Sequence, residues 1–450
     1  MKLKVFGIAV GAILGAAAFL AGPAQAVPAF SHQTGQACSA CHVGAMGPQL
    51  TPYGRQFKLG GFSDSQGKND WVPLSIMADA SFEHSRAKTV ADPNAPSGFK
   101  NNNNLALEEV GLFYAGRVYD HLGALAQMTW VNDGTVHRWQ WDNTDIRYGR
   151  DTNIGGVDAT VGVSVNNSPT VSDIYNTTPT WGFPFQSAAG APGSEFATLI
   201  QDGLGGRVIG ATAYGLFADT VYVEAGAYRP LTNNQVRWGG QYADEGPMLD
   251  GTAPYWRVAL QHDMLKQNFS VGTFGMLANV LPNNDSSSGT TDRFRDFGFD
   301  ATYQWLGDRT HVFSVNATAI REWQKLSATL AAGGAGREHQ SLDTYNLNAT
   351  YVYDQTYGVR LGAFKTHGSH DGTLYTANSA NSPDAGGYIA EVDWTPFGKK
   401  DSWMQPWVNV TLALQYTGYW QIDGRSTNVD GDGRKASDNN TTALLLRWAF

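Results

Sequence analysis

Apolar and polar residues alternate along most of this chain after its first seventy or so positions. In the cleanest stretches every second residue is aliphatic, aromatic or alanine, and most residues between them are polar or glycine. Four stretches show this best: Val157 to Val165, Phe297 to Trp305, Tyr345 to Tyr353 and Val408 to Tyr416. A period of two is typical of β-strands that place one face against an apolar medium and the other against water. The pattern therefore predicts an all-β protein.

The number of strands and the lengths of their connections favour a closed barrel. Between Trp71 and Phe450 we count about sixteen segments of this kind, an even number that returns both ends of the barrel to one side of a membrane. Short connections are Ala218 to Thr220, Gly307 to Arg309 and Asp354 to Thr356, and long ones are Asn167 to Gly205, Pro230 to Ala253, Gln324 to Ser341 and Trp420 to Asn439. Outer-membrane barrels have short periplasmic turns and long extracellular loops, and we expect the same orientation here.

The C-terminus and the composition agree with a membrane barrel. Leu444, Leu446, Trp448 and Phe450 share one face of the final strand, and this ending resembles the signal read by the outer-membrane insertion machinery. The chain has 52 glycines, 12% aromatic residues and only 16% charged residues, which favours strands and turns. A soluble secreted β-sandwich is the alternative, because alternation alone also describes a half-buried sheet.

The N-terminus predicts export. Lys2 and Lys4 precede an apolar run from Val5 to Leu20 and then Ala24-Gln25-Ala26, the pattern of a secretory signal peptide over residues 1–26, cleaved after Ala26. A retained membrane anchor is the alternative, but the run is short for a spanning helix.

The motif Cys38-Ser-Ala-Cys41-His42 predicts one covalently attached haem c. Two thiols three positions apart match the two vinyl groups of a haem, and the adjacent histidine becomes the proximal iron ligand. Cys38 and Cys41 are the only cysteines of the chain, so no four-cysteine metal site or other disulfide competes for them. A redox-active disulfide beside an unrelated histidine is the alternative.

Two stretches resemble the outer-membrane monohaem cytochrome-porin fusions, whose best known members oxidise extracellular iron(II). The first comprises Pro28 to Gly35, the haem motif and Pro48 to Lys58; the second comprises Asn166 to Thr170, Asn176 to Pro179 and Trp181 to Pro184. The resemblance implies a haem c segment over 27–68 that plugs the lumen of a barrel over 69–450. It also implies that electrons pass from iron(II) or another extracellular donor through the haem to a periplasmic cytochrome or other carrier.

Further haem contacts are less determined by the sequence. Arg55 and Lys58 follow the motif closely and are candidates to pair with the haem propionates. The sequence does not identify the distal haem ligand. Candidates are His32, ten residues before His42, then Met77, His84 and Met128 in the barrel, and a five-coordinate iron; Met46 is too close to His42 to reach the other face of the haem.

The net charge and the positions of the charged residues restrict the molecules that this protein is expected to bind. The net charge of -9 argues against nucleic acid. Strand parity places Asp79, Glu83, Glu109, Asp158, Glu224, Asp300, Glu391 and Asp393 in the lumen, with Arg117, Arg257, Arg360 and Arg447. The loop acids Asp244, Glu245, Asp430 and Asp432 are candidates for docking a divalent cation.

The sequence thus predicts an electron-transfer protein of the outer membrane, an oxidase only for the iron(II) half-reaction. Two other functions stay open. One is a diffusion porin with a haem-containing plug, and the other is electron export to an extracellular acceptor, since the sequence does not reveal the reduction potential.

Overall fold

A computed structural model describes residues 27–66, 72–86, 102–132, 137–177, 184–186, 188, 191, 196–201, 203–243, 246–287, 289–376, 379–429, 431 and 433–450. The expected signal peptide and its cleavage point lie outside these residues. The four loop acids expected to dock a cation, Asp244, Glu245, Asp430 and Asp432, lie outside them too.

Strands make up most of the described chain. They are β1 (Leu74–Ser85), β2 (Asn104–Tyr119), β3 (Leu122–Asn132), β4 (His137–Ile154), β5 (Val157–Asn166), β6 (Val208–Phe217), β7 (Val221–Pro230), β8 (Met248–Leu249), β9 (Ala253–Asp263), β10 (Gln267–Leu281), β11 (Asp292–Trp305), β12 (His311–Lys325), β13 (His339–Tyr353), β14 (Tyr357–Gly368), β15 (Ala385–Trp394), β16 (Asn409–Gln421) and β17 (Thr441–Ala449). The helices are α2 (Pro28–Thr34), α3 (Cys38–Cys41), α4 (Pro52–Leu59), α5 (Pro169–Ser172), α6 (Asn233–Trp238) and α7 (Ser327–Ala331), with 3-10 turns η1 (Pro282–Asn284) and η2 (Ala436–Asn439). Among the described residues no helix is long and apolar enough to cross a membrane.

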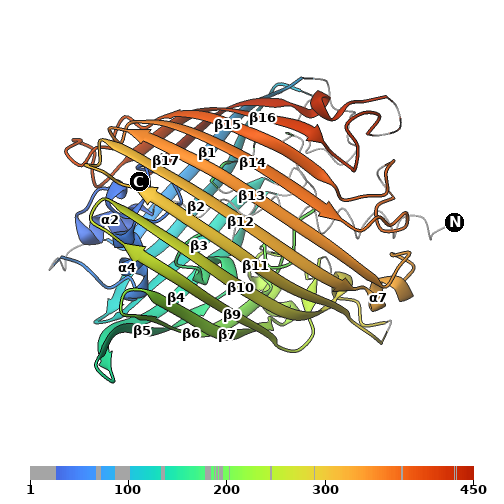
Figure 1. The fold of residues 1–450 in the computed structure, drawn as a ribbon, viewed down its shortest axis with the longest axis horizontal. Helices are drawn as coiled ribbons and strands as arrows, with labels where there is room; N and C mark the ends of the chain where they lie inside the picture. The colour runs from blue at the N-terminus through green and yellow to red at the C-terminus, as the bar shows by residue number, and fades with distance from the viewer. Residues whose placement is uncertain are drawn as a thin grey trace.

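The strands form one closed antiparallel barrel (Figure 1). Each long strand pairs with the strands before and after it, and β17 closes the ring by pairing with β1. The two-residue strand β8 extends the line of β9, because both pair with β10. Within the described chain, sixteen long strands therefore surround the lumen. The expectation of an all-β barrel with about sixteen strands is confirmed.

The outer face of the barrel is apolar. Leu347 and Leu361 are 53% and 56% exposed on neighbouring strands, while the residues between the outward ones are mostly buried. Aromatic residues gather where the strands meet the short turns: Tyr303, Trp305, Tyr351, Tyr353, Tyr357 and Trp394. An apolar band bordered by aromatic residues is typical of transmembrane barrels, and it is not expected of a soluble sandwich.

The two ends of the barrel differ. Short turns join β6 to β7, β11 to β12 and β13 to β14 at one end, which also carries the longer connection 395–408 between β15 and β16. The other long connections, such as those after β5, β12 and β16, lie at the opposite end. Helices α2 and α4 and the C-terminus lie at the short-turn end, and α7 lies at the opposite end (Figure 1). Both ends of the described chain therefore lie on the side that the sequence assigned to the periplasm.

Candidate functional site

The haem motif lies on a compact loop that α4 holds in place. The backbone N–H of His42 donates to the Cys38 carbonyl at 3.0 Å and ends the single turn of α3. Thr51 fixes this turn to the start of α4, because its N–H donates to the Cys41 carbonyl at 2.8 Å and its hydroxyl to the Ala40 carbonyl at 2.6 Å. A Cβ on Gly54 would lie 2.3 Å from the Cys41 carbonyl oxygen, so only glycine permits this close approach.

A cavity opens directly beside the motif. Its space, including the open mouth, is about 1000 Å³. Cys38, Cys41 and His42 line it. Most of the remaining wall is apolar, and its members include Val27, Phe30, Leu50, Phe57, Phe62, Phe113, Leu125 and Val171.

Three phenylalanines form the aromatic side of this cavity. The rings of Phe30 and Phe62 stack with their centroids 5.1 Å apart, and Phe57 meets Phe30 edge-on at 5.0 Å. Phe30 and Phe57 belong to the stretch that resembles the cytochrome-porins, but sequence reasoning gave neither a role. A flat aromatic wall beside two thiols is suited to packing a planar macrocycle.

Burial keeps the motif in its uncharged forms. It lowers the pKa of His42 to about 4, so the imidazole is neutral at pH 7, as an iron ligand must be. Burial raises the pKa of the Cys41 thiol to about 12, with the nearby Cys38 as a further cause, and it also raises the pKa of Cys38. A redox-active disulfide needs a low thiol pKa, so this environment disfavours that alternative.

The chemistry of the residues that line the cavity fits a haem c. The buried Nδ1 of His42 has no hydrogen-bond partner among the described residues, and both cysteines are free thiols. A buried polar atom without a hydrogen-bond partner requires an explanation. A role of the His42 imidazole as iron ligand would supply one, because an iron-bound imidazole binds the metal through one ring nitrogen and a neighbouring group through the other.

The second stretch that carried the resemblance reaches the same cavity. Thr170, Val171 and Asn176 line it together with the haem motif, more than one hundred residues away in sequence. The Asn176 amide donates to the Pro48 carbonyl at 2.9 Å. Residues 178–183 of this stretch lie outside the described residues. The two stretches singled out by sequence therefore meet at one site.

Arg55 and Lys58 attach the haem segment to the barrel and its loop. The Arg55 guanidinium is 3% exposed and pairs with Asp263 at 2.5 Å. The Lys58 ammonium donates to the carbonyls of Val171 and Asp173 at 2.7 and 2.8 Å. Lys58 also lines the cavity, whereas Arg55 does not. The propionate role stays a prediction for both residues, and these anchoring contacts were not foreseen.

The candidates for the distal ligand lie in different environments. The His32 ring packs on Trp407 with centroids 4.4 Å apart, and burial lowers its pKa. Met46 and Met77 are buried in an apolar cluster that also contains the cavity residues Val27 and Phe113. His84 and Met128 are exposed on the outside of the barrel, which disfavours both as haem ligands. The assignment of His32 stays a prediction.

The inner wall is charged as strand parity indicated, and its charges are paired. Arg257 contacts Asp300 and also Asp173 at 3.5 Å. Arg360 contacts Glu391 and, at 2.8 Å, Asp393. Most of the acids that strand parity assigned to the lumen are buried. Asp158 is an exception, because it is exposed beside a turn. The pairing of the strand that carries Glu109 is irregular, with a bulge near Asp79.

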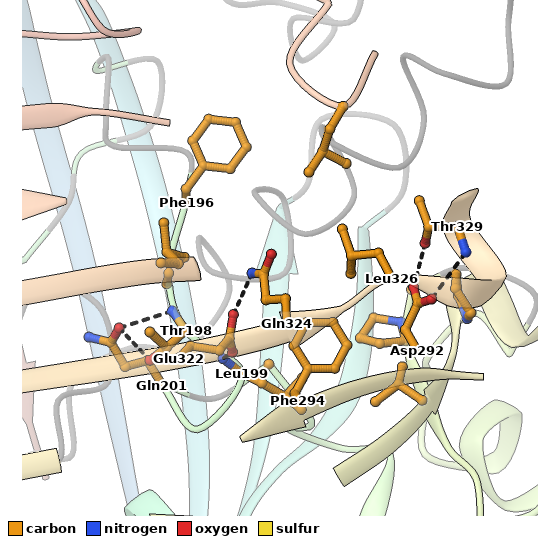
Figure 2. Close-up of a pocket in the computed structure, with 18 of the residues that line it drawn as sticks. Phe196, Thr198, Leu199, Gln201, Asp292, Phe294, Glu322, Gln324, Leu326 and Thr329 are labelled. Atoms are coloured by element: carbon orange, nitrogen blue, oxygen red, sulfur yellow. Dashed lines mark hydrogen bonds between the residues drawn. The ribbon is translucent and has the colours of Figure 1, made fainter. Parts of the chain in front are cut away.

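A second cavity lies at the long-loop end of the barrel (Figure 2). Leu199, Phe294, Leu326, Leu374 and Tyr375 line it, and all five belong to the largest buried apolar cluster. The loop residues 196–201 close this end by bonding to the wall: the Leu199 N–H donates to Glu322 at 2.6 Å and the Ile200 N–H to Asp296 at 2.7 Å. The lumen is therefore filled by side chains at this depth.

Comparisons with known proteins assign this chain to no family. No family model matches the chain, and no curated protein matches its sequence. Among solved structures the chain is similar to an anion-selective porin from Comamonas acidovorans, with a TM-score of 0.45 and 11% identity over 84% of this chain and 98% of that one. It is also similar to OmpT, an outer membrane protein of Vibrio cholerae, with a TM-score of 0.42 and 11% identity over 85% and 99%. A third is the outer membrane channel DcaP of Acinetobacter baumannii, at 0.43 and 10% over 87% and 99%. At these values the likeness carries no information about substrates.

Proposed function

We propose that this chain is an outer-membrane cytochrome-porin that transfers electrons from an extracellular donor, iron(II), to a periplasmic carrier. One observation carries the proposal: Cys38, Cys41 and His42 line a buried cavity to which both cytochrome-porin-like stretches contribute. When bound, a haem c supplies reversible one-electron chemistry. The remaining steps are derived from the residues of the chain.

Cys38 and Cys41 would hold the haem by thioether bonds, and His42 would be its proximal ligand. Phe30, Phe57 and the other apolar residues of the cavity would exclude water from it. Low solvent access and a low dielectric raise the energetic cost of the charged oxidised state and thereby set the potential. Lys58, at the cavity wall, is placed to offset negative charge there.

The filled lumen favours electron transfer over solute diffusion. At the short-turn end Gln49 donates to Asn348 and Thr350, Arg55 binds Asp263, and the Gln304 amide donates to the Leu50 carbonyl. At the long-loop end residues 196–201 bind the wall. Segments from two parts of the chain thus occupy the interior, which is expected of a plugged barrel and not of an open porin.

The proposed direction of transfer rests on the chemistry of iron. Iron(II) oxidised at the outer surface leaves its poorly soluble iron(III) product outside, while the electron leaves on the periplasmic side, where both described chain ends lie. A soluble cytochrome or other carrier is the expected acceptor. Export of electrons to an extracellular acceptor is the same path in reverse.

Anaerobic mixing of the purified, oxidised holoprotein with iron(II) near pH 7 tests the proposal. We expect the haem spectrum to become that of the reduced form, and a midpoint potential measured on the same sample should lie above that of the iron couple. Full reduction by dithionite combined with no reduction by iron(II) would eliminate iron(II) as donor. Planar-bilayer recordings separate the porin alternative, because a filled lumen should pass little current.

A further inference from the structure

The outer face of β11 to β14 carries a cluster of cations at its long-loop end. These four strands lie side by side, and α7 marks the long-loop end of β12 and β13 (Figure 1). Arg293, Arg295, Arg321, Lys325 and Lys365 are all exposed and outward-facing there. His339 and His367 lie among them, 75% and 54% exposed.

Strand register arranges these cations in rows. Arg293 lies opposite Lys325, which lies opposite His339. Two positions nearer the membrane centre, Arg295 lies opposite Trp323, and the next row places Arg321 beside Phe297. Rows on one face of a strand are about 7 Å apart, so the four rows that carry these cations extend over about 20 Å at the long-loop edge of the apolar band.

Carboxylates balance only part of this charge. Asp343 pairs with Arg321, Glu338 with Lys325 and His339, and Asp384 with His367. Arg293, Arg295 and Lys365 form no ion pair with a described residue. Outside this patch, Arg229 of β7 is an exposed cation at the long-loop end of its strand. The patch on β11 to β14 is therefore a local excess of positive charge.

An apolar groove runs directly below the cluster. One row across the four strands consists of Ala301, Ala317, Leu347 and Ala363, and the row above it is Phe299, Ala319, Tyr345 and Lys365. The small alanines leave a shallow depression in the outer surface, with Lys365 and Trp420 at its edge.

We propose that this face binds the phosphorylated glycolipid of the outer leaflet, with an acyl chain in the alanine groove, one lipid phosphate near Arg293 and Arg295, and a second near Lys365. The proposal rests on the outer-membrane location but not on haem or iron(II). Two complementarities carry it. The groove is apolar like a hydrocarbon chain, and the cations lie at its long-loop side, where each cation near a headgroup contributes about 1 kcal/mol to anionic lipid binding.

A second copy of the chain is the competing occupant, because small residues also favour close contact between barrels. The cluster argues against it, since packing two such faces together would bring like charges into contact or bury cations without partners. The binding experiment therefore includes a measurement of the oligomeric state.

Native mass spectrometry of the folded protein in neutral detergent tests the proposal, with bisphosphorylated lipid A as probe. We expect one tightly bound lipid per chain. Replacing three cations together (R293Q, R295Q and K365Q) should weaken binding about fivefold for each charge removed. A319W should also weaken binding, because the indole fills the groove, and R229Q is the matched control that should leave binding unchanged.

Four results would overturn this assignment. Dephosphorylated lipid A with the same acyl chains binding as tightly as the phosphorylated lipid would refute phosphate recognition, whereas full competition by inorganic phosphate alone at equal concentration would refute the contribution of the acyl chain. Unchanged binding by both the triple variant and A319W would refute the location. Dimers or trimers that are lost in A319W would identify the face as a contact between copies. None of these results depends on the electron-transfer function, which is tested separately by iron(II).

Discussion

Replacing Gly149 with alanine should release the haem segment from the barrel wall without unfolding the barrel. Gly149 lies on β4 and faces inward, where α4 ends. A Cβ at this position would lie 1.9 Å from the Leu59 carbonyl oxygen and 2.7 Å from the Tyr214 hydroxyl. That hydroxyl donates to the same Leu59 carbonyl at 2.7 Å, so one methyl group would disturb both partners of the bond.

The size of the effect follows from these distances. To reach an ordinary contact the end of α4 must move by about 1.5 Å, which separates Leu59 from Tyr214. Overpacking costs about 1 to 3 kcal/mol, and the lost hydrogen bond costs about 1 kcal/mol more. An expected loss of about 2 kcal/mol or more makes the undocked state of the segment at least about thirtyfold more populated.

Limited proteolysis and conductance measure this change. Cleavage within residues 27–66 should accelerate by about the same factor when undocking is rapid, and channel openings in planar bilayers should become more frequent. Gly60, on the docked segment itself, is the matched control. Its backbone φ is -74°, and a Cβ there would approach the nearest atom only to 3.3 Å, so G60A should behave as the unmodified protein.

Equal proteolysis and conductance for G149A and the unmodified protein would refute the docking argument. A G149A variant whose barrel no longer folds would also contradict the docking argument. Alanine is otherwise acceptable in a strand interior, and Gly149 makes no contact on the outer face of the barrel.

Three further outcomes are expected. Replacing Cys38 and Cys41 with serine should abolish covalent haem, and a haem-stained band surviving on a denaturing gel would disprove the attachment. D263A should undock the segment more than R55M, as compared by proteolysis, because D263A leaves the buried Arg55 charge without its partner. Burial and, secondarily, Arg147 lower the pKa of Lys58 to about 8. The unfolded segment then holds more protons between about pH 8 and 10.5, so docking should strengthen as pH rises through that window; K58M should lose this dependence.

Most of the barrel could be predicted from sequence, because the alternation of apolar and polar residues that indicates a strand involves only neighbouring positions. Alternation in Val157 to Val165 and Tyr345 to Tyr353 identified β5 and most of β13, and the final strand faces outward through Leu444, Leu446 and Trp448 as expected. A period of two requires no knowledge of distant residues. Local irregularities were not readable, and the bulge between Asp79 and Ala80 is one example.

The interior was less predictable because its contacts join distant parts of the chain. Arg55 and Asp263 are 208 residues apart, and no feature of either local sequence identifies the other. The filling of the long-loop end by residues 196–201 was likewise not foreseen, since their partners Asp296 and Glu322 lie about one hundred residues further along the chain and were given no role from sequence. The haem motif could be predicted from sequence because covalent attachment fixes its spacing. The cavity beside the motif could not be predicted, because distant parts of the chain form it.

The wall of the haem cavity is assembled from three separate parts of the chain, and this composition has a consequence for biogenesis. Residues of α2 and α4, residues around α5, and strands β2 and β3 each supply one side. No cavity exists before these parts meet, and after β17 seals against β1 the cysteines are enclosed. Under the proposed function, the enzyme that attaches haem must therefore act on the exported chain before the barrel closes. Insertion into the outer membrane would then favour chains that carry haem, because a chain that lacks haem would have to close around an unfilled interior.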